Sequence, residues 1–388
     1  MAIRKEALAG KAFQALKAVY DDRKAVLSKW NAEGKKVVLT AGADIPEEMI
    51  LAAGMYPFPL TSFYGERPAA EKYLEYSFGP LWKGMWESLV ADYKGLAKYI
   101  VFCSSSDMYL KLFNYVRTLR IYEPELGLPE PKYVDLELVD KVYKAQERNE
   151  RELGYLKDQL EAWSGNQITE EKLLAAIDLC NEYRDALTQF AELRKAENCR
   201  VLGSEALVVF GGSMFMEKAE AIKLVKEVTE EAKAWPLAEG NRVYFIGSRQ
   251  ETTEVYDLAE EQGLNIVGED SDMGDRMFQQ NIGKAYTAIS AIVERIMHRM
   301  PSSEKGRVKL RAEWVDRRLE ETNANALITW MNKNDEAYVW DQKTLRDYSL
   351  IPKGIAEVTI DMQQWPLQNV EETKAKFASL KNAVRKEQ

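Results

Sequence analysis

The sequence predicts an α/β protein in which two doubly wound parallel-sheet lobes are joined by a helical segment. Short apolar runs alternate with helical periodicity over residues 1–138 and again over residues 237–388. This alternation is typical of parallel sheets with right-handed helical crossovers. Residues 139–236 instead carry long charged helical patterns with leucine stripes, which indicates a helical connector between the lobes.

The first lobe is predicted to begin with an exposed amphipathic helix over residues 1 to about 30, which Gly34 ends. Apolar runs of four or five residues predict the strands of this lobe, at 36–40, 56–60, 99–102 and 133–136. Helical spacing and proline positions predict its other helices, at 46–54, within 67–92 and at 106–120.

Two stretches of the connector allow more than one interpretation. Residues 207–210 fit a strand or a helix, and residues 211–213 resemble a helix start without the Gly-Lys-Ser/Thr ending of a phosphate loop. In the second lobe, Ser248 with Glu251 fits a capping box for a helix that ends at Gly263. The other expected elements of this lobe are strands at 242–246, 265–267, 326–329 and 357–360, helices at 282–300, about 306–322 and 341–349, and a closing helix.

Composition and charge exclude several classes of protein. A net charge of −9 argues against nucleic acid as a partner. The amino terminus lacks the apolar core of a signal peptide, and no run of about 18 apolar residues indicates a membrane span. The three cysteines are too few and too scattered for a disulfide framework or a closed zinc site. We therefore expect a cytoplasmic protein that needs no membrane.

The turn after the strand at 99–102 is the first candidate site. Cys103 follows that strand, and ligands of open α/β sheets collect outside the carboxyl ends of strands. Ser104 and Ser105 come next and a helix follows. The alternative is that Ser104 and Asp107 form an N-cap and N3 pair, in which case the polar cluster only caps the helix.

Four stretches together resemble the subunits of the 2-hydroxyacyl-CoA dehydratase and benzoyl-CoA reductase family, and most closely its small, beta-type subunit. Residues 45–57 (IPEEMILAAGMYP) are similar to the Pro-Glu-Glu and Ala-Ala-Gly-Met segment of that family. Residues 168–184 resemble its Ala-Ile-x-x-Tyr-Asn-x-x-Arg helix, with Cys180 in place of Tyr. Residues 267–278 resemble its acidic loop ending in Arg, and the strand before Cys103 resembles its strand ending in Cys-Asp.

The resemblance implies two related subunits that act on an acyl-CoA. It implies a [4Fe–4S] cluster on three cysteines, and an ATP-dependent activator protein that supplies one low-potential electron. This chain departs from the pattern, because only Cys103 of the three cysteines is present. Ser104 stands for the usual Asp, the first cysteine position falls at Tyr76 or Gly79, and Asp335 stands at the third. We therefore expect that a related iron–sulfur partner subunit carries most of the cluster.

The resemblance also suggests roles for seven residues. Asp335, Glu48 and Ser104 are candidate catalytic groups, Glu47, Ser105 and Arg276 are candidate substrate-binding groups, and Cys103 is the candidate cofactor and metal ligand.

Each role has a structural alternative. Glu47 and Glu48 fit favourable charges in a first helical turn, and Arg276 fits a salt bridge with Asp270 or Asp272. For the whole chain, the alternative to an enzyme subunit is a non-catalytic paralogue that completes a heteromer. A separate hydrolase is not supported, because the only histidine, His298, is expected on a helix surface.

Overall fold

The computed structural model describes residues 3–137, 144–195, 197, 199–300, 305–335 and 337–387. The predicted boundary between the first lobe and the connector, at residues 138 and 139, lies outside these ranges. Among the helices of the described part, none combines the length and the apolar character needed to cross a lipid bilayer.

Two parallel four-stranded sheets form the two lobes, which confirms the predicted fold class. The first has the order β2-β1-β3-β4 and the second the order β6-β5-β7-β8. The strands of the first sheet are β1 (Val37–Ala41), β2 (Tyr56–Pro59), β3 (Tyr99–Cys103) and β4 (Glu130–Val134). Those of the second are β5 (Asn241–Gly247), β6 (Leu264–Asp270), β7 (Ala326–Asn332) and β8 (Ala356–Gln363). Winding reverses between β1 and β3 and again between β5 and β7, and these two switch points are where ligands of such sheets bind.

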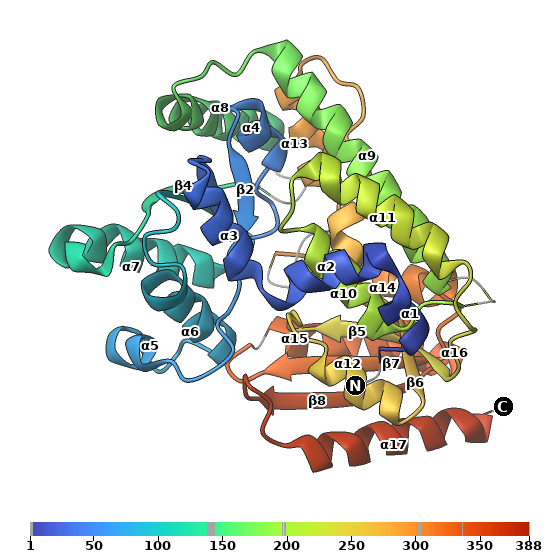
Figure 1. The fold of residues 1–388 in the computed structure, drawn as a ribbon. Coiled ribbons are helices and arrows are strands. Elements are labelled where there is room, and N and C mark those ends of the chain that lie inside the picture. Colours follow the sequence, from blue (N-terminus) through green and yellow to red (C-terminus); the bar gives the residue numbers. More distant parts are fainter. Residues whose placement is uncertain are drawn as a thin grey trace.

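Helices cover the sheets and connect them (Figure 1). In the first lobe they are α1 (Lys5–Ala9), α2 (Lys11–Asp21), α3 (Arg23–Ala32), α4 (Glu47–Ala52), α5 (Pro68–Tyr73), α6 (Pro80–Glu87) and α7 (Asp107–Tyr122). Between the lobes they are α8 (Ala145–Ser164), α9 (Glu170–Lys195), α10 (Gly203–Ser213) and α11 (Lys218–Ala232). In the second lobe they are α12 (Glu254–Glu261), α13 (Ala288–His298), α14 (Val308–Glu321), α15 (Ala337–Leu345), α16 (Ile351–Lys353) and α17 (Val370–Glu387). Four short turns of other helix types complete the structure, at Ser88–Asp92, Pro124–Leu126, Asp275–Phe278 and Arg346–Leu350.

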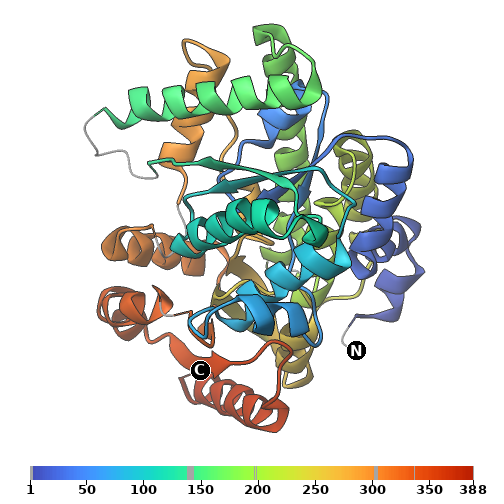
Figure 2. The ribbon, with the colours of Figure 1, turned by 90° about the vertical axis from the view of Figure 1, so that its left-hand side faces the viewer.

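The two sheets occupy separate halves of the molecule, and the helical segment runs alongside both (Figures 1 and 2). The hydrophobic core is nevertheless continuous between the lobes, because one cluster of buried residues includes Phe58 and Phe102 of the first sheet and Phe245 of the second. The connector contributes Phe190 and Phe210 to the same cluster. The lobes are therefore packed together through a shared core.

The N-terminal helix prediction is wrong in two respects. Residues 5–32 form three helices, because Gly10 has extended backbone and Asp22 begins a new helix by accepting a hydrogen bond from the backbone N–H of Ala25 at 2.9 Å. The helices are also less exposed than predicted, since Phe13 and Leu16 are buried where α2 packs on α10 and α11. Tertiary packing has replaced solvent on the apolar face of this segment.

Two local predictions in the connector and second lobe are corrected by the structure. Residues 211–213 end α10 and do not begin a helix, and residues 207–210 are helical. Ser248 does not cap a helix, since α12 begins only after Thr253 and the Ser248 hydroxyl donates a hydrogen bond to Asp335. A local spacing rule cannot detect a partner 87 residues away.

The remaining boundary differences are small and have local causes. The predicted helix over 282–300 begins only at Ala288, where Thr287 accepts a hydrogen bond from the backbone N–H of Ser290. Strand β4 extends back to Glu130 and includes Pro131. A proline is tolerated there because β4 is an edge strand of its sheet.

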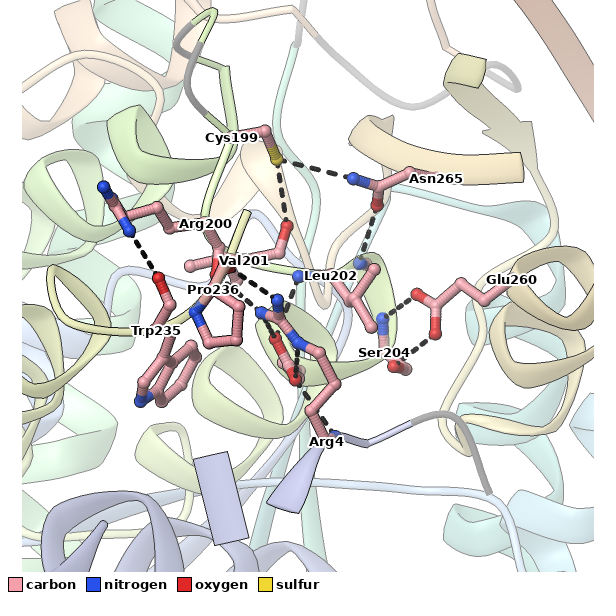
Figure 3. Close-up of polar contacts among 12 residues, drawn as sticks. Arg4, Cys199, Arg200, Val201, Leu202, Ser204, Trp235, Pro236, Glu260 and Asn265 are labelled. Atoms are coloured by element: carbon pink, nitrogen blue, oxygen red, sulfur yellow. Dashed lines mark hydrogen bonds and ion pairs between the residues drawn. The ribbon is translucent and has the colours of Figure 1, made fainter. Parts of the chain in front are cut away.

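The N-terminal segment is fixed to the connector by a cluster of polar contacts (Figure 3). The Arg4 guanidinium donates to both carboxylate oxygens of Glu205, at 2.9 and 2.7 Å, and to the carbonyl of Pro236 at 2.7 Å. Asn265 donates to the Cys199 sulfur at 3.4 Å and accepts from the backbone of Gly203. Cys199 is thus a buried residue whose sulfur takes part in this cluster.

Close packing of α10 on α2 depends on glycine, and Gly212→Ala is expected to destabilise the protein by about 1–3 kcal/mol, as overpacking of a well-packed core does. A β-carbon at Gly212 would lie 2.3 Å from the backbone carbonyl oxygen of Leu16, which cannot move without shifting α2. Denaturant unfolding followed by circular dichroism measures the loss.

Gly154→Ala is the matched control, because Gly154 is also in a helix but has no heavy atom within 4 Å of the added carbon. Helix propensity should stabilise this variant by up to about 1 kcal/mol. Equal denaturant midpoints of unfolding for Gly212→Ala and Gly154→Ala would contradict the packing explanation.

Candidate functional site

Two neighbouring cavities lie where the loops after β1, β3, β5 and β7 meet. The first, here called the basic cavity, has a volume of about 120 Å³ and receives Gly42 and Ala43 from the loop after β1. Its charged lining includes six cations: Arg184, Lys218, Arg249, Arg276, Arg295 and Arg299. The second, here called the Asp335 cavity, has a volume of about 60 Å³ and is lined by Ser105, Ser248 and Asp335 among others. Arg249, Asp272 and Arg276 line both cavities.

Glu47 and Glu48 begin α4 and line the basic cavity. Glu48 is buried and accepts a hydrogen bond from the guanidinium of Arg184. Glu47 lies 2.7 Å from the ammonium of Lys218. Burial by itself raises the pKa of Glu48, but the positive charges of Arg184 and Arg295 outweigh it and hold that pKa below its usual value. Each of the two glutamates therefore lines the cavity with its own cation beside it.

Cys103 ends β3 but lines neither cavity. Its sulfur is fully buried, lies 3.2 Å from the Ser105 hydroxyl, and packs against Gly42, where a β-carbon would come within 2.4 Å. Gly42 also has a backbone φ of +121°, so this close approach requires glycine. Burial raises the pKa of Cys103 to about 12. At neutral pH it is a protonated thiol.

The serines after Cys103 have separate tasks. The Ser104 hydroxyl donates to the carbonyl of Leu136 and accepts from its N–H, both at 2.9 Å, so it ties this loop to the segment after β4 and does not line either cavity. Ser105 lines the Asp335 cavity. Ser106, and not Ser104, is the N-cap of α7, because its hydroxyl accepts from the backbone N–H of Met108. The capping interpretation of Ser104 with Asp107 is therefore wrong.

Asp335 follows β7 and is held by the loop after β5. The Ser248 hydroxyl donates to Asp335 at 2.5 Å and accepts from the backbone N–H of Asn332 at 2.9 Å. Burial raises the pKa of Asp335, and the hydrogen bond from Ser248 opposes that rise. The result is a carboxyl group in a dry position that can hold a proton closer to neutrality than an exposed aspartate.

Arg276 forms the salt bridges proposed as its structural alternative. Its guanidinium lies 3.3 Å from Asp270 and 3.1 Å from Asp272. Because it lines both cavities, it also remains placed to meet a ligand. Its Nη1 is buried and has no hydrogen-bond partner in the described part of the chain.

The candidate residues are thus divided between two neighbouring cavities. The basic cavity contains Glu47, Glu48 and Arg276, and the Asp335 cavity contains Ser105, Arg276 and Asp335. The position of Glu48, Cys103, Ser104 and Asp335 in loops after strands predicts that they surround one cavity. This prediction is wrong, because Cys103 and Ser104 line neither cavity, and Glu48 and Asp335 line different ones.

The sequence did not identify most of the cations of the basic cavity, or Ser248, as residues of the site. These residues lie on or at the ends of helices α9, α11 and α13 and in the loop after β5. The available signal was charge inside an otherwise apolar stretch of a helix, as for Glu294 and Arg295 between Val293 and Ile296. Such a charge indicates a buried site or an internal ion pair, without telling which.

The donor atoms of this chain do not fit a [4Fe–4S] cluster. Such clusters are held by several thiolates, whereas the three implied positions offer the buried Cys103 thiol, the Asp335 carboxyl group and either Tyr76 or Gly79. Cys180 and Cys199 are buried in the connector region. Among the described residues, no group of three or more His, Cys, Asp or Glu side chains is arranged to hold a metal ion.

The fold and the cavities define a class: a two-lobed α/β protein with charged cavities beside the switch points of both sheets. The chain belongs to the 2-hydroxyglutaryl-CoA dehydratase, D-component family, whose pattern matches residues 43–381.

Three curated relatives agree with this family. The chain is 25% identical over 356 residues to the beta subunit of (R)-phenyllactyl-CoA dehydratase from Clostridium sporogenes, which covers 89% of this chain and 92% of that subunit. It is 24% identical over 361 residues to subunit beta of (R)-2-hydroxyglutaryl-CoA dehydratase from Acidaminococcus fermentans, with 88% and 92% covered. It is 25% identical over 361 residues to the lactoyl-CoA dehydratase beta subunit of Anaerotignum propionicum, with 90% and 92% covered. The resemblance to a beta-type dehydratase subunit is confirmed.

Proposed function

We propose that this chain is the beta-type subunit of a cytoplasmic, oxygen-sensitive complex that removes water from a 2-hydroxyacyl-CoA. The observation that carries the proposal is the nearly full-length match to three dehydratase beta subunits. All three relatives are named as dehydratases, which favours dehydration over aryl-CoA reduction. In this proposal an alpha-type partner subunit carries the [4Fe–4S] cluster and an ATP-dependent activator protein supplies the electron.

The polar cavities support an active part for this chain in binding the acyl-CoA. Arg276 and Asp335 line the cavity at the ends of β5 and β7, where a thioester oxygen would meet a cation and a proton donor. Both groups are held in place, Arg276 by Asp270 and Asp272 and Asp335 by Ser248. Rigid positioning of this kind is what a binding site for a reacting group requires.

The second candidate function is a non-catalytic subunit that completes the heteromer. Two observations favour it: the Cys103 thiol is buried away from both cavities, and Glu47 and Glu48 are neutralised by Lys218 and Arg184. Turnover by the reconstituted complex separates the candidates when the wild-type chain is compared with Asp335→Asn, because only an active subunit should lose turnover on this change. The test is to co-express each form of this chain with its alpha-type partner, purify the pair without oxygen, and assay (R)-2-hydroxyacyl-CoA dehydration with and without activator and ATP.

We predict that the isolated chain, purified without oxygen, contains far less iron and acid-labile sulfide than one complete cluster per chain, because Cys103 is the only thiol at the three implied ligand positions. The purified pair should contain a cluster, and Cys103→Ser in this chain should leave its iron content unchanged. Iron near four per isolated chain that disappears in Cys103→Ser would refute this assignment of the cluster to the partner.

A further inference from the structure

The basic cavity contains more positive charge than its own carboxylates neutralise. Five of its six cations each have a carboxylate within ion-pair distance: Arg184 with Glu48, Lys218 with Glu47, Arg249 with Glu251, Arg299 with Asp44, and Arg276 with Asp272 and also with Asp270, which is shared with Arg311. Arg295 has no such carboxylate among the described residues. Arg295 is the sixth cation, and its positive charge is the one that no nearby carboxylate in the described part of the chain pairs with.

Arg295 is buried with 9% of its surface exposed, and its hydrogen bonds within the described part of the chain go to neutral atoms. Its guanidinium donates to the backbone carbonyl of Gln280 at 2.7 Å and to that of Gln279 at 3.2 Å. Burial and the nearby positive charges of Arg184 and Arg299 lower the pKa of Arg295 to about 9, a large departure for a guanidinium. A buried charge in these surroundings is costly unless a counter-ion accompanies it.

Other donors of the cavity also lack acceptors. The Nη1 of Arg276, the Nε of Arg299 and the Nε of Arg249 are buried without a hydrogen-bond partner in the described ranges. All three residues line the same cavity as Arg295, and all come from different elements of the fold. Buried polar groups in native proteins normally have partners, so these donors indicate a ligand that accepts hydrogen bonds.

From this geometry we infer that the basic cavity binds a small carboxylate whose counter-charge is Arg295. The excess of one positive charge matches a carboxylate, which carries one negative charge, better than a phosphate group, which carries nearly two at neutral pH. A volume of about 120 Å³ is also small, which suits a carboxylate on a short chain.

The carboxylate has two possible sources. It is either a free short-chain acid or the terminal carboxylate of a dicarboxylic acyl group on coenzyme A. The second source rests on the proposed function, because it requires that this chain binds acyl-CoA. Arg295 then acts as a residue that selects for acyl chains ending in a carboxylate.

The test begins with the full chain and glutarate as the probe. Glutarate should raise the unfolding temperature of the wild type saturably, compared with sodium chloride at equal ionic strength, and butyrate should do so more weakly. Arg295→Gln should weaken glutarate binding about tenfold in isothermal titration, the size expected for one charge-assisted hydrogen bond. Arg317→Gln is the matched control, because Arg317 is an exposed arginine on α14 that lies over the Trp314 ring and lines neither cavity.

Stability without ligand separates binding from a structural role. If Arg295 only holds the Gln279 and Gln280 carbonyls, Arg295→Gln lowers the unfolding temperature with or without glutarate, and this outcome would overturn the inference. If Arg295 is a counter-charge, the ligand-free variant is as stable as the wild type or more stable, because an uncompensated buried charge has been removed. Should the variant fail to fold, the wild type still decides: no response to glutarate, or an equal response to inorganic phosphate, overturns the inference.

The assembled complex distinguishes the two sources. Tighter binding of glutaryl-CoA than of butyryl-CoA, lost in Arg295→Gln, supports the acyl-chain source. Binding of free glutarate without any such preference supports the free-acid source and counts against acyl-CoA binding by this chain. Equal binding of both thioesters, unchanged in Arg295→Gln and with no glutarate response, overturns the inference and leaves the proposed function intact.

Discussion

Replacing Arg194 by methionine is expected to lower the free energy of unfolding by about 3–5 kcal/mol, because it leaves two buried carboxylates without their cation. Arg194 lies on α9 with none of its side chain exposed. Its guanidinium donates to both oxygens of Glu269, at 2.6 and 2.9 Å, and to Asp275 at 2.8 Å. The ion pair between Arg194 and Glu269 joins the helical connector to β6 of the second lobe. Urea unfolding of the full chain measures the change in the free energy of unfolding.

The pH dependence of the variant tests the electrostatic explanation. Burial already raises the pKa of Glu269 beside Arg194, and loss of that cation should raise it further, so the folded variant binds more protons than the unfolded chain. Stability of Arg194→Met should therefore be lost as pH rises through the raised pKa of Glu269 and should recover at lower pH.

Two further variants serve as comparisons. Arg194→Met combined with Glu269→Gln and Asp275→Asn should recover part of the loss at neutral pH, since no unpaired charge remains buried. Arg317→Met, at an exposed position, should change the free energy of unfolding by less than about 0.5 kcal/mol. A midpoint for Arg194→Met equal to that of the wild type would contradict the assigned role of this ion pair.

The inner strands of both sheets were predictable because they are largely apolar runs that are buried in a parallel sheet. β3 and β7 illustrate this, with every residue of β7 buried and its predicted start at Ala326 correct. Such runs can be recognised from the local sequence alone, without knowledge of the strands beside them. The helix at residues 1–30 was mispredicted, since its apolar stripe continues across Gly10 and Asp22 while the backbone does not.

The candidate site was predictable only where it is local. Ser105 and Asp335 follow strands, and the rule that ligands collect at strand carboxyl ends places them correctly beside a cavity. The direction in which a side chain points depends on distant residues. The Ser104 hydroxyl, for example, donates a hydrogen bond to the carbonyl of Leu136, 32 residues away. The pairing of Arg184 with Glu48 spans 136 residues. Such contacts depend on how helices pack, and a single sequence does not specify that.

Asp335→Asn in the assembled complex is expected to reduce dehydration by about tenfold to a hundredfold, at the lower edge of what positioned acid–base groups contribute. Burial raises the pKa of Asp335, which favours the protonated form over that of an exposed aspartate, and in that form the group can donate to a substrate oxygen. Asparagine keeps the shape and can still accept the hydrogen bond from Ser248, but it cannot deliver a proton. Sedimentation should find the subunits still assembled, and unchanged turnover in an intact complex would support the non-catalytic alternative.

Ser248→Ala supplies the matched test of the same proton. The hydrogen bond from Ser248, 2.5 Å long, lowers the pKa of Asp335, so its removal should raise that pKa further. A group that acts as a proton donor loses activity as pH rises through its pKa. The falling limb of the pH–rate profile of the complex should therefore move to higher pH in Ser248→Ala, and it should be absent in Asp335→Asn. A limb that stays in place in both variants would show that Asp335 does not provide the proton, whatever the size of the rate loss.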